Sequence, residues 1–236
     1  MTEWLIKIKG DRNDLDLLQR FLRSGKYTVI HENASWFLKV HELTSDTTPR
    51  EIRDAAISAI EIVNGAARLF YSKFQGVSSN VTVLTIMSDG SRQEFNFLNA
   101  TAPDYNLTVF RDTDTRLTDW IALANNDQAV ANALTLYGAL ELTWKNLYIV
   151  LEAVEDDIVG GESGLINHNW VPKSQIKLFK TTANSFRALG RVARHGPNNK
   201  QPPQRPMTIQ EARKLINNIV RKWLESKGSK ILCNQP

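Results

Sequence analysis

The spacing of apolar positions changes from an alternating pattern near the N-terminus to a helical pattern in the second half of the chain. At the start, Trp4, Ile6 and Ile8 recur at every second position, which predicts a half-buried strand. Between residues 14 and 24 the apolar residues adopt helical spacing, and this segment predicts a helix that ends at Gly25.

A predicted hairpin and a capped helix come next. Two strand-like runs, 27–32 and 35–43, are separated by Asn33 and favour a hairpin. Thr48 and Glu51 form the signature of a capping box, because the hydroxyl and the carboxylate each accept a hydrogen bond from an orphan backbone N–H. The sequence therefore predicts a helix that begins directly after Thr48.

We expect that helix to end at Asn64-Gly65 and the pattern to return to strands. Four strand-like runs occupy residues 68–74, 81–87, 92–98 and 105–110. The Asp89-Gly90 pair favours a hairpin, because both residues tolerate the positive φ of a type I′ turn. Residues 1–110 thus predict a small α+β domain with a mostly antiparallel sheet. They contain neither a dinucleotide-binding fingerprint nor a P-loop.

From about Asp114 the apolar spacing is helical and remains so. Residues 125–127 are a predicted cap, and residues 128–159 predict either one very long helix or two helices broken near Gly138. Gly160-Gly161 ends this segment, and a loop is expected over residues 161–172.

The last two predicted helices complete a bundle of four or five helices. One begins at Ser174 and continues to His195, and the other follows a second capping box at Thr208 and Glu211 and ends at Gly228. Residues 111–236 are therefore expected to form an all-α domain.

Charge is distributed unevenly along the 236 residues, whose net charge is +4. Residues 170–236 carry 14 Lys and Arg against 2 acids, whereas the rest of the chain carries 15 against 23. Such a basic region favours nucleic acid, nucleotide phosphates or an acidic protein surface, or it docks against acidic helices of the same chain.

Neither the apolar runs nor the cysteine content indicate a membrane or secreted protein. No run approaches the roughly 18 apolar residues of a membrane helix, and Cys233 is the single cysteine. We therefore expect a cytoplasmic protein without an internal disulfide, without a Cys-based metal cluster and without a cofactor.

A cluster of four acids lies at the predicted C-terminal end of the central helical segment, at Glu152, Glu155, Asp156 and Asp157. Anions are unfavourable there because that end of a helix carries partial negative charge. The cluster needs partners, which either the basic region or a metal could supply. No histidine stands at ligand spacing, so no metal site is predicted.

Arg187, Arg191 and His195 are spaced at i, i+4 and i+8 in a segment predicted to be helical. This spacing would align two guanidiniums and an imidazole on one helical face as a phosphate site. The alternative is that His195, which precedes Gly-Pro, simply complements the dipole at the end of a helix.

The segments LTWKNLYIVLEAVEDDIVGG and TTANSFRALGRVARHG, followed by a proline-rich turn and a final amphipathic helix, resemble HEPN domains over roughly residues 115–228. The resemblance implies a bundle of four or five helices that often dimerises. Many HEPN domains are metal-independent ribonucleases or nucleotide-binding modules of bacterial toxin and anti-phage systems.

The resemblance and the local charge together assign candidate roles to six residues. The resemblance implies catalysis by His195 and Arg191, and the basic charge of the same segment and of the loop after it predicts nucleic-acid contacts by Arg187, Arg194, Lys200 and Arg205. Cleavage of RNA without a metal requires a base for the 2′-hydroxyl proton and cations beside the phosphate. We therefore expect a homodimer that binds or cleaves RNA, with a protein partner from a defence operon. The alternative is a non-catalytic module of a defence complex that binds nucleic acid or protein.

Overall fold

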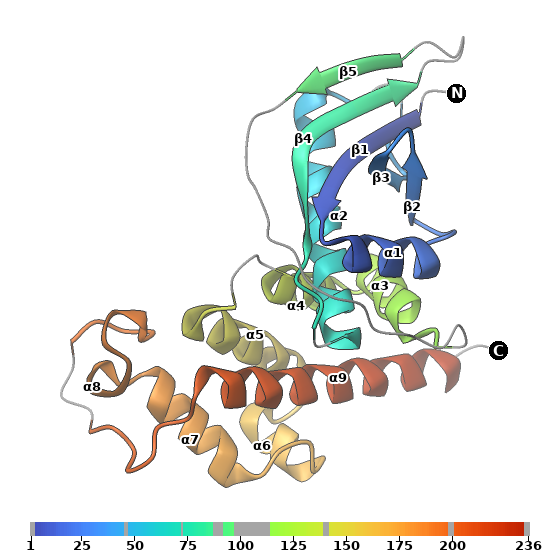
Figure 1. Ribbon diagram of the computed structural model, residues 1–236. Coiled ribbons are helices and arrows are strands. Elements are labelled where there is room, and N and C mark those ends of the chain that lie inside the picture. The colour runs from blue at the N-terminus through green and yellow to red at the C-terminus, as the bar shows by residue number, and fades with distance from the viewer. Residues whose placement is uncertain are drawn as a thin grey trace. The chain divides into compact units, whose positions relative to one another are not determined.

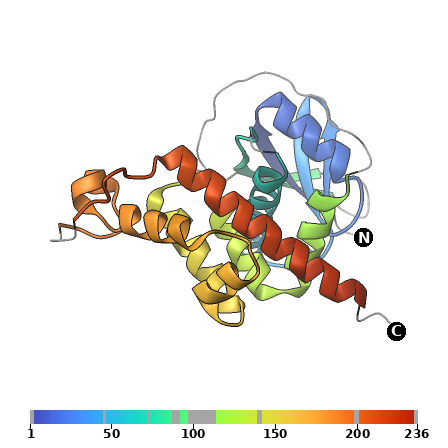
Figure 2. The same ribbon diagram turned by 90° about the horizontal axis from the view of Figure 1, so that it is seen from below.

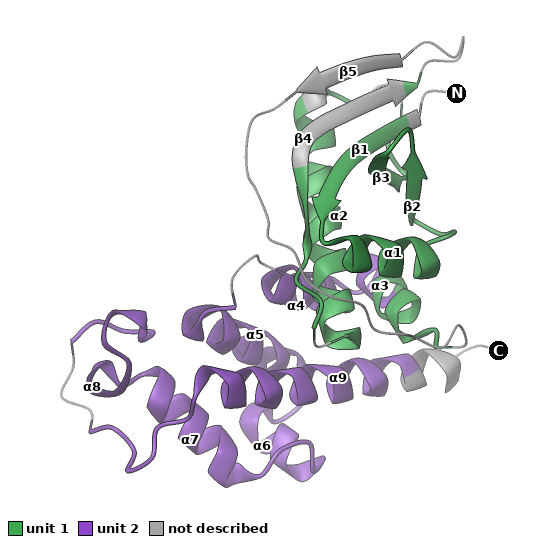
Figure 3. Cartoon of the chain, viewed as in Figure 1, with its two compact units in different colours: residues 1–122 green, residues 123–236 purple. Residues whose placement is uncertain are grey.

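The computed structural model describes residues 3–44, 47–71, 73–86, 92–96, 114–138, 142–197 and 201–233. These residues form an α+β protein, and the chain divides into two compact units, residues 1–122 and residues 123–236 (Figure 3). Within the described ranges no helix has both the length and the apolar character needed to cross a membrane.

In its described residues, unit 1 contains a sheet, the helices α1 and α2, and the first residues of α3 (Arg116–Asn126), a helix that continues into unit 2 (Figure 1). The elements that precede α3 are β1 (Glu3–Gly10), α1 (Arg12–Phe21), β2 (Tyr27–Glu32), β3 (Ser35–Val40), α2 (Pro49–Phe70), β4 (Val77–Ile86) and β5 (Arg92–Asn96). The strand order is β2-β3-β1-β4-β5, and every neighbouring pair is antiparallel. The connectivity from β1 to β4 is the split β-α-β arrangement of ferredoxin-like folds, with β5 added at one edge.

The strand register gives the sheet of unit 1 two different faces. One face carries Ile6, Leu38 and Val29 in a row across β1, β3 and β2, and all three side chains are buried. The next residues along the strands, Leu5 and Lys39, are paired with each other and point to the opposite face. The alternation predicted for β1 is therefore confirmed on its core face.

The predicted hairpin and the first capping box are both confirmed. Asn33 and Ala34 connect β2 to β3 with φ values of 50° and 57°, the left-handed region that a tight hairpin turn requires. At the start of α2, Glu51 N–H donates to Thr48 Oγ1 at 3.3 Å and Thr48 N–H donates to Glu51 Oε2 at 2.9 Å.

The predicted end of α2 at Asn64-Gly65 is wrong, because the helix continues to Phe70. The Asn64 side chain is buried and makes two hydrogen bonds with the backbone of Val77, to its C=O at 2.8 Å and from its N–H at 2.9 Å. Arg68 Nη2 donates to the backbone C=O of Gln75 at 2.7 Å. These tertiary bonds hold the segment in helical form, so the strand predicted over residues 68–74 does not form.

Two sequence predictions for unit 1 lie outside the described residues. They are the turn at Asp89-Gly90 and the strand over residues 105–110. The strands predicted over residues 81–87 and 92–98 correspond to β4 and β5, which pair in antiparallel fashion with Val83 opposite Phe95.

Unit 2 is helical, and α3 (Arg116–Asn126) leads into it. It contains α4 (Gln128–Gly138), α5 (Trp144–Asp157), α6 (Gly161–Asn167), α7 (Lys173–Ala183), α8 (Phe186–Leu189), a 3₁₀ turn (Gly190–Val192) and α9 (Ile209–Cys233). The long α9 lies across α5 (Figure 2). In the core, the ring of Phe179 stacks against Trp144 and Tyr148, with ring centroids 5.9 Å apart in both pairs.

Several helix boundaries in unit 2 differ from the sequence prediction. Of the two alternatives for residues 128–159, two separate helices are correct, with residues 139–141 outside the described chain. Part of the loop predicted over residues 161–172 is the helix α6. A Cβ at Gly164 would stand 2.4 Å from the Val159 carbonyl oxygen, so glycine permits this close return of the chain. The predicted stop at Gly228 is also wrong, since α9 continues to Cys233.

Candidate nucleic-acid interface

The acidic end of α5 is neutralised by cations of the C-terminal basic region. Lys180 of α7 places Nζ 2.8 Å from Glu155 and 2.8 Å from Glu162. Burial raises the pKa of the Glu155 carboxyl above its ordinary value, and Lys180 opposes that shift. Burial lowers the pKa of Lys180, but its two carboxylate partners outweigh this and the net direction is upward. The ammonium therefore remains charged in this cluster.

Arg194 is the second cation directed at α5. Its Nη2 donates to Glu152 at 2.8 Å, and its guanidinium lies over the Tyr148 ring, 3.9 Å from the centroid. The backbone N–H of Arg194 donates to the Ala183 carbonyl at 2.8 Å. Arg194 thus closes the turn that follows α7 and directs its charge toward α5.

Lys227 provides the third intramolecular contact. Its Nζ bridges Asp157 at the end of α5 and Asp127 at the start of α4. Trp223 Nε1 donates to the same Asp157 carboxylate at 2.8 Å. Of the two partners considered for the acidic cluster, the basic region therefore supplies the contacts of Glu152, Glu155 and Asp157.

The continuous helix predicted to carry Arg187, Arg191 and His195 is wrong. α7 ends at Ala183, and Ser185 caps the short α8 by accepting a hydrogen bond from Ala188 N–H at 3.2 Å. Gly190 then takes a positive φ of 60° and starts a 3₁₀ turn. As a result Arg187 lies in α8, Arg191 lies in the 3₁₀ turn, and His195 follows both. The three side chains do not share one helical face, and no helix ends at His195.

The structure still leaves four of the predicted site residues exposed along this segment. Arg187, Arg191, His195 and Arg205 are all exposed, whereas Arg194 is half-buried. Arg187 Nη1 donates to Gln201 Oε1 at 3.1 Å, which brings α8 beside the proline-rich segment. Lys200, the remaining candidate, lies outside the described residues.

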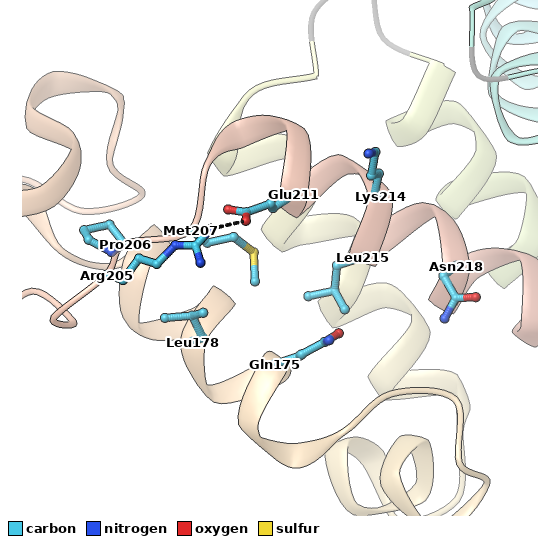
Figure 4. A pocket seen from close by; sticks show the side chains of 9 residues that line it. All are labelled: Gln175, Leu178, Arg205, Pro206, Met207, Glu211, Lys214, Leu215 and Asn218. Atoms are coloured by element: carbon cyan, nitrogen blue, oxygen red, sulfur yellow. Dashed lines mark hydrogen bonds and ion pairs between the residues drawn. The ribbon is translucent and has the colours of Figure 1, made fainter.

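Arg205 also borders a groove between α7 and the start of α9 (Figure 4). The groove has a volume of about 460 Å³, and Leu178, Met207 and Leu215 form its apolar wall. The Arg205 guanidinium pairs with Glu211 at 2.9 Å, and Lys214 stands on the next turn of α9. The sequence pattern identified Arg205 but not this groove, because Leu178 and Leu215 are 37 positions apart in the chain and lie in different helices.

The second capping box fixes Glu211 at the rim of the groove and is confirmed. Glu211 N–H donates to Thr208 Oγ1 at 3.2 Å, and Thr208 N–H donates to Glu211 Oε2 at 2.8 Å. The hydrogen bonds from Thr208 and the nearby cations lower the pKa of Glu211 below its ordinary value. This carboxylate is therefore ionised at neutral pH and compensates Arg205.

The described residues contain no group of three or more His, Cys, Asp and Glu side chains arranged to hold a metal ion. No protein-family model matches the chain, and neither the curated proteins nor the solved structures give a match. The functional interpretation is consequently built on the geometry of these side chains.

Proposed function

We propose that unit 2 is a HEPN-like bundle that binds RNA through a surface made by Arg187, Arg191, His195 and Arg205, named here the basic end. One observation carries the proposal. The cations of the basic region fall into two groups, and Lys180, Arg194 and Lys227 form the group that pairs with acids of α4 to α6. Within the described chain, the side chains of the basic end make no ion pair with those acids and are exposed, and Arg205 among them pairs with the exposed Glu211 of α9.

Guanidinium groups at an exposed end of a bundle suit a phosphate backbone. Arginine presents a planar fork of N–H donors that matches two phosphate oxygens. The bond between Arg187 and Gln201 joins α8 to the segment that leads to Arg205, four positions after Gln201. Each phosphate that such a surface neutralises releases counterions, which makes binding depend steeply on salt.

The geometry favours binding over cleavage. Metal-free cleavage needs a base and a cation positioned around the same phosphate. Arg191 lies in a 3₁₀ turn and His195 follows it outside any helix, so no regular helix aligns the two side chains, and Arg194 between them is held by Glu152. A non-catalytic module is therefore the function that this arrangement supports best. Both the HEPN-like label and the defence system that it implies remain part of the proposal.

The binding test removes three exposed arginines from the basic end. Arg187, Arg191 and Arg205 are changed to Ala together, and binding of a single-stranded RNA is measured by fluorescence anisotropy at several salt concentrations. Because each single-strand phosphate contact contributes about 0.7 to the slope of log K against log salt, we expect the slope to fall by about 2. Affinity at low salt should fall at least tenfold.

Unit 1 offers a control of equal charge. Arg12, Arg50 and Arg53 are all exposed, and their joint replacement by Ala removes the same three positive charges. This control should leave the slope unchanged. Equal losses in the two triple variants, or no salt-dependent binding by the wild type, would refute the proposed surface.

Cleavage is tested separately with His195→Ala. We expect the wild type to bind RNA in the presence of a chelator without cleaving it. Chelator-resistant cleavage that is lost in His195→Ala would instead establish the ribonuclease that the resemblance implies.

A further inference from the structure

The sheet of unit 1 carries a second groove, on the face opposite to the buried row of Ile6, Leu38 and Val29. Its volume is about 670 Å³, which lies within the usual range for small-molecule sites. Apolar side chains of β1, β2 and β4 line part of it, among them Leu5 and Ile30. The basic end proposed above for RNA contains none of the residues of this groove.

Strand register and one turn bring the polar groups of the groove together. Lys39 of β3 is opposite Leu5 on one side and Thr28 on the other, so these three side chains form a row across the sheet. Arg23 comes from the turn between α1 and β2, where Gly25 has a φ of 99°. The turn therefore adds Arg23 to the strand residues that line the groove.

His41 completes the polar side of the groove. Its Nε2 lies 2.9 Å from Thr28 Oγ1, and its backbone N–H donates to the Lys26 carbonyl at 3.0 Å. The first bond joins the exposed imidazole to Thr28, the residue that is paired with Lys39 in the sheet. Arg23, Lys39 and His41 therefore reach one groove from two loops and a strand.

The charge of the groove differs from the charge of the unit that contains it. Residues 1–122 carry 14 Lys and Arg against 16 acids. The groove, by contrast, has the two cations Arg23 and Lys39 and the imidazole of His41 against the single acid Glu32. Cations gathered in a concave site with apolar walls fit a ligand that has an anionic group attached to an apolar body.

We propose that this groove binds a phosphate monoester of about nucleotide size, with the phosphate toward Arg23 and Lys39 and the organic group against Ile30 and Ile86. Arg23 supplies a planar fork for two phosphate oxygens, and Lys39 supplies a point charge. Thr28 and His41 supply further hydrogen-bonding groups at the same end. The phosphate monoester could be a free nucleotide or the 5′ end of an RNA, and both present the same chemistry.

The test uses the full chain and isothermal titration calorimetry with three probes: adenosine 5′-monophosphate, adenosine and inorganic phosphate. We expect saturable binding of the monophosphate with a submillimolar Kd. Adenosine and inorganic phosphate should each bind at least tenfold more weakly, because adenosine lacks the phosphate and inorganic phosphate lacks the organic group. No saturable binding of the monophosphate up to several millimolar overturns the proposal.

Two single variants and two matched controls locate the site. Arg23→Ala and Lys39→Gln should each weaken monophosphate binding at least tenfold, whereas Arg12→Ala and Lys9→Gln, exposed positions outside the groove, should not change it. Far-UV circular dichroism confirms that each variant is folded. Equal effects of groove variants and controls overturn the assignment.

Competition by a 5′-phosphorylated RNA hexamer, compared with its 5′-hydroxyl form, distinguishes a free nucleotide from an RNA end. The triple variant of the basic end should retain monophosphate binding, so failure of the RNA proposal and failure of this one are separately observable.

Discussion

At the scale of single residues, the role of a cation in this protein depends on what its side chain touches. Arg191 and Arg194 are three positions apart, and both are sequence candidates for the site, Arg191 for catalysis and Arg194 for nucleic-acid contact. Arg191 is exposed in the 3₁₀ turn, whereas Arg194 pairs with Glu152 and stacks on Tyr148. Charge along the sequence therefore does not distinguish a binding arginine from a structural one.

This difference predicts a large loss of stability for one substitution and a small loss for the other. Arg194→Ala removes both an ion pair and a cation–π contact, so we expect the free energy of unfolding to fall by roughly 1–2 kcal/mol. Arg191→Ala should change it by less than about 0.5 kcal/mol, because the side chain is exposed. Urea unfolding followed by tryptophan fluorescence measures both values. A larger loss for Arg191→Ala than for Arg194→Ala would contradict the assignment.

Asp14 of α1 is a buried carboxylate whose environment couples stability to pH. It accepts hydrogen bonds from the backbone N–H groups of Gln75 at 2.8 Å and Gly76 at 3.0 Å. Burial raises its pKa from 3.8 to about 6, and these two donors oppose the shift. Because the folded-state pKa is the higher one, folding favours the protonated form. Its contribution to stability is present below about pH 3.8 and is lost as the pH rises through about 6.

Asp14→Asn tests this coupling because the amide cannot ionise. The free energy of unfolding of the wild type, minus that of the variant, should decrease between pH 4 and pH 7 by at most about 3 kcal/mol. Chemical unfolding at several pH values measures this difference. A difference that stays constant over the range would show that Asp14 ionises in the folded protein as it does in the unfolded chain.

At the scale of elements, one side chain explains why α2 continues past Asn64. Asn64 lies in the middle of a helix, a position where asparagine is intrinsically unfavourable. Its amide bonds both the N–H and the C=O of Val77, and so serves as a pairing partner for the first residue of β4. The helix therefore continues past a residue that would end it in isolation.

Asn64→Ala should consequently destabilise unit 1 strongly. It leaves two backbone groups of Val77 without partners in a buried place, and each such group costs about 1–3 kcal/mol. We expect a loss of roughly 2–4 kcal/mol and faster hydrogen exchange of the Val77 amide. The control Asn132→Ala, at an exposed position of α4, should lose less than about 0.5 kcal/mol. Similar losses for the two variants would refute the role of Asn64.

At the scale of the whole molecule, positive charge is concentrated in unit 2. Residues 123–236 carry 15 Lys and Arg against 9 acids, and residues 1–122 carry 14 against 16. The neutralised end of α5 accounts for part of the basic region, and the exposed remainder is the basis of the proposed RNA surface. The groove of unit 1 is a local exception within an acidic unit.

The homodimer and the protein partner implied by the HEPN resemblance stay predictions. The apolar faces of α5 and α9 pack inside this chain, where residues such as Leu151, Ile219 and Trp223 are buried. A dimer would therefore use other surfaces of unit 2.

Much of the α+β architecture follows from local pattern. Alternation in β1, the turn at Asn33 and the two capping boxes are each decided within a few residues, so the sequence was sufficient to predict them. Helix α9 was predicted from a long apolar stripe. The end of α2 was less predictable, because the Asn64 side chain bonds the backbone of Val77, 13 positions away. The helix α6 after Gly160 was missed because it depends on the close approach of Gly164 to the Val159 carbonyl.

The sequence by itself determined that this protein has an α+β half, a helical half and a strongly basic C-terminal quarter. Only the tertiary structure decided which cations are available to a ligand, because ion pairing links residues such as Arg194 and Glu152, 42 positions apart. It also broke the stripe of Arg187, Arg191 and His195, since the turn after Ala183 is stabilised by a bond from Arg194 back to that residue. The groove on the sheet likewise depends on the register of β1, β2 and β3. Its lining residues are distant in the sequence, so their proximity cannot be read from local spacing.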